Sequence, residues 1–367
     1  MRHALTFLNP AFVFRISADL VASLVVCCVL FSDASSSFAA DSLTWSQLPS
    51  LPSREGFAGP FAGTHHGVLL VAGGANFPGK MPWEGGTKVW YDRVFVLESP
   101  DGVWQDVGEL PRALGYGVSI STEDGVVCIG GSDASRHYAD CFRLKWQDGK
   151  VITTALPPLP KPCANCCGAM MDGTVYVAGG LESPTATSTL KTFWSLNLAN
   201  SNAKWQEHDP WPGPPRMLAT AAVQDNAFFL CSGTDLELGS DGRPIREYLR
   251  DAYSFHPDRG WKRIADMPRA AVASPSPAPG FGPLRFLVLS GDDGTQVDFQ
   301  PLEKHPGFPK SVLAYHSVTD TWQDVGEVPV GQVTTVMVDW RDRFVVPSGE
   351  IRPGVRTSSV WSLLKSK

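Results

Sequence analysis

A short polar stretch near the end of the chain holds the residue types that acid–base chemistry needs. Residues 348–357 read Ser-Gly-Glu-Ile-Arg-Pro-Gly-Val-Arg-Thr, so one carboxylate, Glu350, is followed by two guanidinium groups, Arg352 and Arg356. A positioned carboxylate can remove a proton from a hydroxyl group, and arginine binds anions as a permanently charged fork of donors. The same residues could equally form a solvated salt bridge, so the elements that position them must decide between the two interpretations.

The chain after residue 40 repeats one pattern six times. A strand of small residues precedes an apolar run, an alternating strand follows after a variable loop, and a last strand carries a Trp in most copies. Each apolar run ends in two small residues, at Gly73-Gly74, Gly130-Gly131, Gly179-Gly180, Ser232-Gly233, Ser290-Gly291 and Ser348-Gly349. The outer Trp residues, for which we expect core packing, are Trp45, Trp104, Trp205, Trp261 and Trp322. Four strands in each of six copies predict an all-β, six-bladed β-propeller, a ring that leaves only short protected sheet edges.

The two ends of the chain are predicted to meet in one blade. The sixth copy stops after residues 359–363, one strand short, and residues 43–49 look like the missing outer strand. The residue after each small pair should then emerge at one end of the ring, close to its axis. These six residues are Ala75, Ser132, Leu181, Thr234, Asp292 and Glu350. Only Asp292 and Glu350 among them are acidic, so we expect a pocket beside these two carboxylates.

The repeats resemble those of the Kelch family, and residues 348–357 look like the Gly-Glu-x-x-Pro-Gly-x-Arg-Thr loop of the N-acetylneuraminate epimerases. These are bacterial sialic acid mutarotases built as six-bladed Kelch propellers. Residues 56–63, 72–77 and 116–119 also look like that family. We call residues 348–357 the Glu loop. In the commonest form of the family this loop precedes the segment that corresponds to residues 56–63. Here the loop lies near the end of the chain, as in the group described as cyclically permuted mutarotases.

The resemblance implies interconversion of the α and β anomers of N-acetylneuraminate or a related sugar acid. Ring opening requires removal of the anomeric hydroxyl proton and protonation of the ring oxygen. Glu350 and Arg356 match the acting residues of the family loop, and our hypothesis makes Glu350 the base and Arg356 the partner of the substrate carboxylate or a developing oxyanion. Arginine is a poor proton donor. Asp292, His65, His137 or a bound water could supply the acid.

Other polar residues are predicted to contact the substrate. Arg112 and Arg216 follow prolines and could line the pocket, or they could be the structural arginine common at that point of Kelch repeats. Asn76 could contact a sugar or stabilise its loop, and Asp292 lies at the expected pocket. A rival interpretation of the whole surface is a non-catalytic Kelch module that binds a glycan or a protein, because fold alone does not give function.

The first residues of the chain predict export. Arg2 and Arg15 precede an apolar run over residues 20–31, and residues 37–39 offer small residues at a cleavage site, as in a secretory signal peptide. We therefore divide the chain into a signal peptide over residues 1–39 and a single propeller domain over residues 40–367. We expect a periplasmic or secreted protein, off the membrane after cleavage, that is a monomer or homodimer.

Composition and cysteine spacing bear on which partners, metals and cofactors the protein could bind. The formal net charge is −6 and basic patches are lacking, which argues against nucleic acid as a partner. The family resemblance implies a small-molecule sugar acid as the partner. Six cysteines follow residue 39, and an oxidising compartment permits disulfides between them. Cys163, Cys166 and Cys167 lack a second ligand pair for zinc, so we interpret them as small buried side chains. A copper oxidase lacks its Tyr, His and Cys ligands here, and we expect no metal and no organic cofactor.

Overall fold

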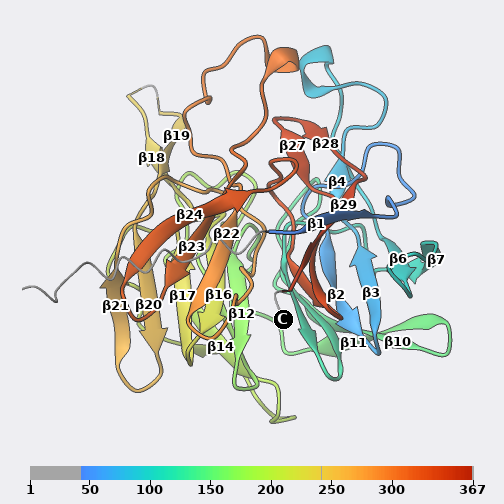
Figure 1. Cartoon of the computed structure of the whole chain (residues 1–367), viewed down its shortest axis with the longest axis horizontal. Helices are drawn as coiled ribbons and strands as arrows, with labels where there is room; N and C mark the ends of the chain where they lie inside the picture. Colours follow the sequence, from blue (N-terminus) through green and yellow to red (C-terminus); the bar gives the residue numbers. More distant parts are fainter. Residues whose placement is uncertain (1–42, 241, 366–367) are drawn as a thin grey trace, which may run out of the picture. The chain divides into compact units, whose positions relative to one another are not determined.

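Six β-sheets form the six blades of a propeller in the computed structural model, which describes residues 43–240 and 242–365 (Figure 1). Residues 41–367 form one compact unit. The only helical elements in the described part are two short 3-10 turns, η2 (Pro82–Glu84) and η3 (Leu302–Lys304). The all-β, six-bladed architecture predicted from the repeats is therefore confirmed.

Each of the first four blades takes its four strands from one sequence repeat. Blade 1 contains β2 (Phe61–His65), β3 (Val68–Ala72), β6 (Arg93–Leu97) and β7 (Gln105–Glu109), and blade 2 contains β8 (Val118–Thr122), β9 (Gly125–Ile129), β10 (Cys141–Gln147) and β11 (Lys150–Leu156). Blade 3 contains β12 (Cys167–Met171), β13 (Thr174–Ala178), β14 (Phe193–Asn197) and β15 (Gln206–Glu207), and blade 4 contains β16 (Thr220–Gln224), β17 (Ala227–Cys231), β20 (Ala252–His256) and β21 (Gly260–Ile264). The second strand of each of these blades is largely buried, which explains its apolar sequence.

The sixth blade is closed by the N-terminal strand. Its sheet runs in the order β1 (Trp45–Leu48), β29 (Val360–Leu364), β26 (Arg343–Pro347) and β25 (Val338–Trp340). Trp45 pairs with Leu363 and Leu48 with Val360, and Figure 1 shows the blue strand β1 beside the red strand β29. The hydroxyl groups of Ser46 and Ser362 lie 2.9 Å apart across this pair. The predicted closure by residues 43–49 is thus confirmed.

Blade 5 corrects the expectation of four strands in every repeat. Its sheet contains only β22 (Arg285–Leu289), β23 (Ser311–His316) and β24 (Thr321–Glu327). The segment where the innermost strand was expected contains Pro275, Pro277 and Pro279. Proline has no N–H to give to a strand ladder, so this segment makes only isolated bridges, Ala222 with Ala278 and Gly280 with Phe286.

Four Trp residues at the outer strands connect blades 1, 3, 4 and 5 to the preceding blade, whereas the indole nitrogen of Trp45 in blade 6 has no hydrogen-bond partner among the described residues. The indole nitrogen of Trp104 donates to the carbonyl of Pro49 at 2.7 Å, and that of Trp322 donates to Ala265 at 2.8 Å. Trp205 and Trp261 make the corresponding bonds to Pro157 and Asp209. These side chains therefore hold the ring together, as the expectation of core packing required.

The described residues bear differently on the predictions about the signal peptide, the membrane and the cysteines. The signal peptide predicted over residues 1–39 lies outside the residues that the structure describes. None of the helices in the described part is long and apolar enough to cross a membrane. The six cysteines between residues 43 and 365 are free thiols, five buried and Cys166 partly exposed, and no group of three or more His, Cys, Asp or Glu side chains there could hold a metal ion.

Candidate active site

A ring of backbone hydrogen bonds surrounds the propeller axis and forms the base of the site. Its members, one from each repeat, are Gly59, Tyr116, Asn165, Leu218, Ala273 and Thr334, and all have positive φ angles between 54° and 62°. The N–H of each donates to the carbonyl of the member from the preceding repeat at 2.7 to 2.8 Å, and Gly59 donates to Thr334, which closes the circle. We call this ring the collar. Five non-glycine residues in the left-handed region are unusual and mark a backbone held by its surroundings.

The residue before each collar member pairs with the residue after each small pair of the sequence. These antiparallel bridges join Ala58 to Ala75, Gly115 to Ser132, Ala164 to Leu181, Met217 to Thr234, Val272 to Asp292 and Val333 to Glu350. The six positions predicted to emerge at one end of the ring therefore do so. Ala75 and Thr234 are fully buried, whereas the other four face a pocket.

The pocket above the collar has a volume of about 450 Å³. This lies within the roughly 300–1,000 Å³ usual for small-molecule sites. Its polar lining contains Lys88, Tyr116, Ser132, Asp133, His137, Asn165, Arg246, Asp292, Thr334, Glu350 and Arg356. The lining comes from all six repeats, so the complete ring is needed to form it.

The Glu loop supplies one wall through a two-stranded hairpin, β27 (Glu350–Arg352) and β28 (Val355–Arg356), in which Glu350 pairs with Arg356. The Nη2 atom of Arg356 lies 3.6 Å from Oε2 of Glu350, and the two side chains are only 4% and 17% exposed. The other carboxylate oxygen, Oε1, accepts the N–H of Gly354 at 2.7 Å. Gly354 turns the hairpin with φ +80°, and an added Cβ would lie 2.7 Å from Pro82. Oε2 accepts no hydrogen bond from the backbone of the loop, so this oxygen can accept a hydrogen bond or a proton from a ligand.

Two hydrogen-bond donors of the Arg356 guanidinium group have no partner among the described residues. Its guanidinium group stacks 4.8 Å from the ring of Phe77. The Nε and Nη1 atoms are buried and have no hydrogen-bond partner among the described residues. A buried donor without a partner is costly, and ligand oxygens could satisfy Nε and Nη1, which point from different edges of the guanidinium group.

A second cation, Lys88, stands on the same wall and was missed by sequence reasoning. It directly precedes β5 (Val89–Trp90), which pairs with β4 (Ala75–Asn76). Its Nζ atom lies 4.1 Å from the ring centre of Tyr116 and 4.7 Å from that of Trp90. Burial and the nearby Arg356 guanidinium lower the pKa of Lys88 from 10.5 to about 8, while Glu350 opposes the change. The sequence gives no sign of this partly buried position in the pocket wall, because Lys88 is one lysine in a loop that also contains glycines and another lysine.

Tyr116 joins the collar to this wall. Its hydroxyl is buried and makes no hydrogen bond of ordinary geometry within the described residues. Burial raises the pKa of Tyr116 far above its usual value, although the Arg356 guanidinium opposes this rise. The neutral phenol ring therefore serves as a face for the Lys88 ammonium group.

The other walls carry Asp133, His137 and Asp292. Burial pushes the pKa of Asp133 upward, but hydrogen bonds from Tyr138, Ser135 and Arg136 outweigh it and hold the pKa well below the usual range. Nδ1 of His137 lies 2.9 Å from the carbonyl of Leu181, and burial lowers the pKa of His137. Asp292 accepts the Tyr248 hydroxyl and the Gly294 N–H, each at 3.0 Å.

Several predicted site residues lie elsewhere. Arg112 does not line the pocket; it pairs with Asp140 at 3.0 Å and stacks 4.4 Å from Tyr138. Asn76 is buried, and its amide donates to the Gly56 carbonyl at 2.8 Å and accepts the Tyr91 hydroxyl at 2.9 Å. Asn76 is therefore a loop stabiliser that holds β4 in place. His65, a candidate acid, is buried in β2 and accepts the Trp146 N–H at 3.0 Å, outside the pocket lining.

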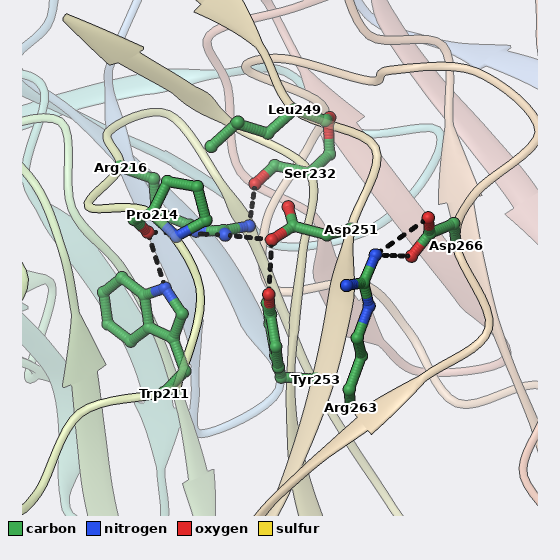
Figure 2. A network of polar contacts seen from close by, with 9 residues as sticks. All are labelled: Trp211, Pro214, Arg216, Ser232, Leu249, Asp251, Tyr253, Arg263 and Asp266. Carbon is green, nitrogen blue, oxygen red and sulfur yellow. Dashed lines mark hydrogen bonds and ion pairs between the residues drawn. The ribbon is translucent and has the colours of Figure 1, made fainter.

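Arg216 is the clearest correction among the predicted substrate contacts. Its side chain has no exposed surface, and Figure 2 shows its guanidinium group held between Pro214, Ser232 and Asp251. Nη1 donates to the Ser232 carbonyl and Nη2 to the Asp251 carboxylate, both at 2.8 Å. The Tyr253 hydroxyl also donates to Asp251. The two Nη atoms of Arg216 are bound within the protein, and only Nε has no hydrogen-bond partner among the described residues. A guanidinium group without exposed surface cannot reach a ligand, so Arg216 is the structural arginine of its repeat.

Comparison with known proteins links the first part of the chain to one family. The family model described as N-acetylneuraminate epimerase matches residues 32–153. The N-acetylneuraminate epimerase of Salmonella enteritidis is 48% identical over 128 residues, which cover 30% of this chain and 33% of that protein. The protein of the same name from Haemophilus influenzae is 37% identical over 130 residues, covering 32% and 34% of the two chains.

The similarity to these proteins covers only part of the chain. The chain spans about a third of the length of the curated relatives it matches. The family model covers β1, blade 1 and blade 2 as far as the middle of β11, including Lys88 and Tyr116, but it ends well before the Glu loop. The roles of Glu350 and Arg356 therefore stay predictions. Over residues 32–153 this chain is similar to the N-acetylneuraminate epimerases, as its sequence motifs predicted.

Proposed function

We propose that this protein is a mutarotase that interconverts the α and β anomers of N-acetylneuraminate or a closely related sugar acid. The observation that carries the proposal is the buried pair of Glu350 and Arg356 at the wall of the central pocket, with one carboxylate oxygen and two guanidinium donors left for a ligand. The likeness of residues 32–153 to proteins named N-acetylneuraminate epimerase supports the choice of substrate.

The geometry suits a sugar acid whose carboxylate is attached to the anomeric carbon. Arg356 would donate to that carboxylate through Nη1 or Nε, the two donors without a partner in the described residues. The 3.6 Å between Arg356 and Glu350 then brings the anomeric hydroxyl within reach of Oε2. Glu350 removes the hydroxyl proton, the bond from the anomeric carbon to the ring oxygen breaks, and the open ketone can close again on either face.

The second candidate function is a Kelch module that binds a glycan or protein without changing it. The pocket would serve that function equally well as a recognition surface, because the same cations and acceptors bind sugars. Catalysis separates the two candidates. A binding module leaves the rate of anomer exchange at its value in buffer, whereas a mutarotase raises it.

The test follows the equilibration of freshly released α-N-acetylneuraminate by NMR, with and without the purified protein. We expect faster exchange with the protein and loss of the added rate in Glu350→Gln, with ligand binding retained. Glu109→Gln, on the exposed outer strand β7, is the matched control and should exchange normally. Near-normal exchange in Glu350→Gln would refute the assignment of the base.

Location and assembly form part of the proposal. The signal-like sequence of residues 1–39 supports a periplasmic or secreted protein that is free of the membrane after cleavage. Burial raises the pKa of the thiols of Cys128, Cys141, Cys167 and Cys231. The hydrogen bond with Cys166, together with burial, raises the pKa of Cys163, and all five thiols are therefore protonated and unreactive. Free thiols of this kind are compatible with an oxidising compartment. A monomer or homodimer is the expected assembly.

A further inference from the structure

The pocket contains a base but needs a group that protonates the ring oxygen. Asp133 is held ionised by its hydrogen bonds, and both oxygens of Asp292 already accept hydrogen bonds. His137 carries its proton on Nδ1, since that atom faces the Leu181 carbonyl, so the neutral ring offers only an acceptor at Nε2. Arg356 keeps its proton in proteins. These four side chains therefore do not supply the acid.

Lys88 has the position that the acid needs. It lines the same pocket as Glu350 and Arg356 and reaches it from the neighbouring blade. Its ammonium group rests on the faces of Tyr116 and Trp90, whose rings meet edge to face at 6.3 Å. Within the described residues Nζ has no carboxylate or carbonyl as a hydrogen-bond partner, so all three of its N–H groups are available to a ligand.

The charged surroundings of Lys88 are compatible with proton transfer. Arg356 lies on β28, Glu350 lies on β27, and the phenol of Tyr116 belongs to the collar. Among the described residues, Glu350 is the only acidic side chain that raises the pKa of Lys88, against burial and the like charge of Arg356, which lower it. The result is an ammonium group that releases its proton more easily than an ordinary lysine does, close to neutral pH.

We infer that Lys88 is the proton donor to the ring oxygen, an inference that rests on the proposed mutarotase function. In the opening step Glu350 takes the proton of the anomeric hydroxyl, and the C–O bond to the ring oxygen breaks. The electron pair of that bond takes a proton from the Lys88 ammonium group, which becomes an amine. Closure reverses both transfers: the amine removes the proton from the attacking hydroxyl, and Glu350 returns its proton to the former ketone oxygen. No other reactant is consumed.

The experiment compares Lys88→Arg with Lys88→Met in the full-length processed protein, using the NMR exchange assay. Arginine keeps the positive charge and can bind a carboxylate, but it cannot give up a proton. We expect kcat to fall about 100-fold or more in both variants, the usual contribution of a general acid, with KM little changed in Lys88→Arg. We expect the wild-type kcat to decline above pH 8, where Lys88 loses its proton, and we expect both variants to lack this decline.

Lys80→Met is the matched control, because Lys80 is exposed in the same loop and should leave exchange unchanged. Circular dichroism verifies the fold of each variant, and Lys88→Gln replaces any variant that fails to fold. A rate within a few-fold of wild type in Lys88→Arg would overturn the inference, since Lys88 would then supply charge alone. If the wild-type protein adds nothing to the exchange rate in buffer, the proposed function itself fails. If Glu350→Gln loses the added rate of anomer exchange while Lys88→Arg exchanges at the normal rate, only the role of Lys88 is rejected.

Discussion

Replacing Lys88 with methionine should stabilise the folded protein at neutral pH. The structure holds a half-buried ammonium group beside Arg356 without a hydrogen-bonded anion in the described residues, and the pKa falls from 10.5 to about 8. This difference corresponds to at most about 3 kcal/mol of unfolding free energy. Water still reaches part of the group, so we expect a gain of about 1–2 kcal/mol in Lys88→Met at pH 7.

The sign of the pH dependence follows from proton binding. Below pH 8 both the folded and the unfolded chain carry the Lys88 proton, and the full cost of burying the charge is present. Between pH 8 and 10.5 the unfolded chain binds more protons at this site, so the stability of the wild type rises with pH relative to the variant. The advantage of Lys88→Met should therefore shrink across this interval and vanish near pH 10.5.

Urea unfolding of the wild type and the variant, at pH 7 and at several values up to 10.5, measures this difference. Lys80→Met, which removes an exposed ammonium group from the same loop, should match the wild type at every pH. A variant that is less stable than the wild type at pH 7, or an advantage that does not change with pH, would refute the description of Lys88 as a destabilised cation. A gain in stability with a loss of activity is the usual trade at a functional residue.

Two further changes test the supports of the site. Arg216→Met should lower the unfolding free energy by about 3–5 kcal/mol in urea titrations, because it leaves the Asp251 carboxylate buried without its partner. Arg263→Met, which breaks an exposed ion pair, should change it by less than about 1 kcal/mol, and equal effects would contradict a structural role for Arg216. Gly56→Ala should slow anomer exchange about 100-fold, because its φ is +75° and the new Cβ would lie 1.9 Å from the Thr357 carbonyl, displacing the end of the Glu loop. Normal exchange in a folded Gly56→Ala protein would show that this close approach does not position the loop.

The architecture was predictable because its signals are local or periodic. The small-residue pairs mark the same turn in each repeat, and the shortage of one strand at residues 359–363 pointed to residues 43–49 as its partner. The place of Glu350 followed from its position after the sixth pair, which the bridge to Val333 bears out. The prolines 275, 277 and 279 were also visible, and they should have excluded an inner strand in blade 5.

The side-chain environments could not be predicted from the same patterns. Arg216 and Arg356 are both nearly buried, yet both Nη atoms of Arg216 are bound by Ser232 and Asp251, whereas Nη1 and Nε of Arg356 have no hydrogen-bond partner among the described residues. That distinction depends on contacts between segments far apart in the chain. Lys88 is a stronger case, because its burial arises only when the Glu loop and Tyr116 pack around the hairpin of β4 and β5.

The shared blade also imposes an order in time on the formation of the ring. Ser46 and Ser362 face each other across β1 and β29 although 316 positions separate them. On the ribosome β1 emerges long before β29, so the other five blades can assemble while the last sheet still lacks its outer strand. The Gly59 to Thr334 bond of the collar likewise joins the first repeat to the last. Because pairing over such a separation is opposed by chain entropy, closing the circle should be the slow final stage of folding, and the pocket exists only once it is complete.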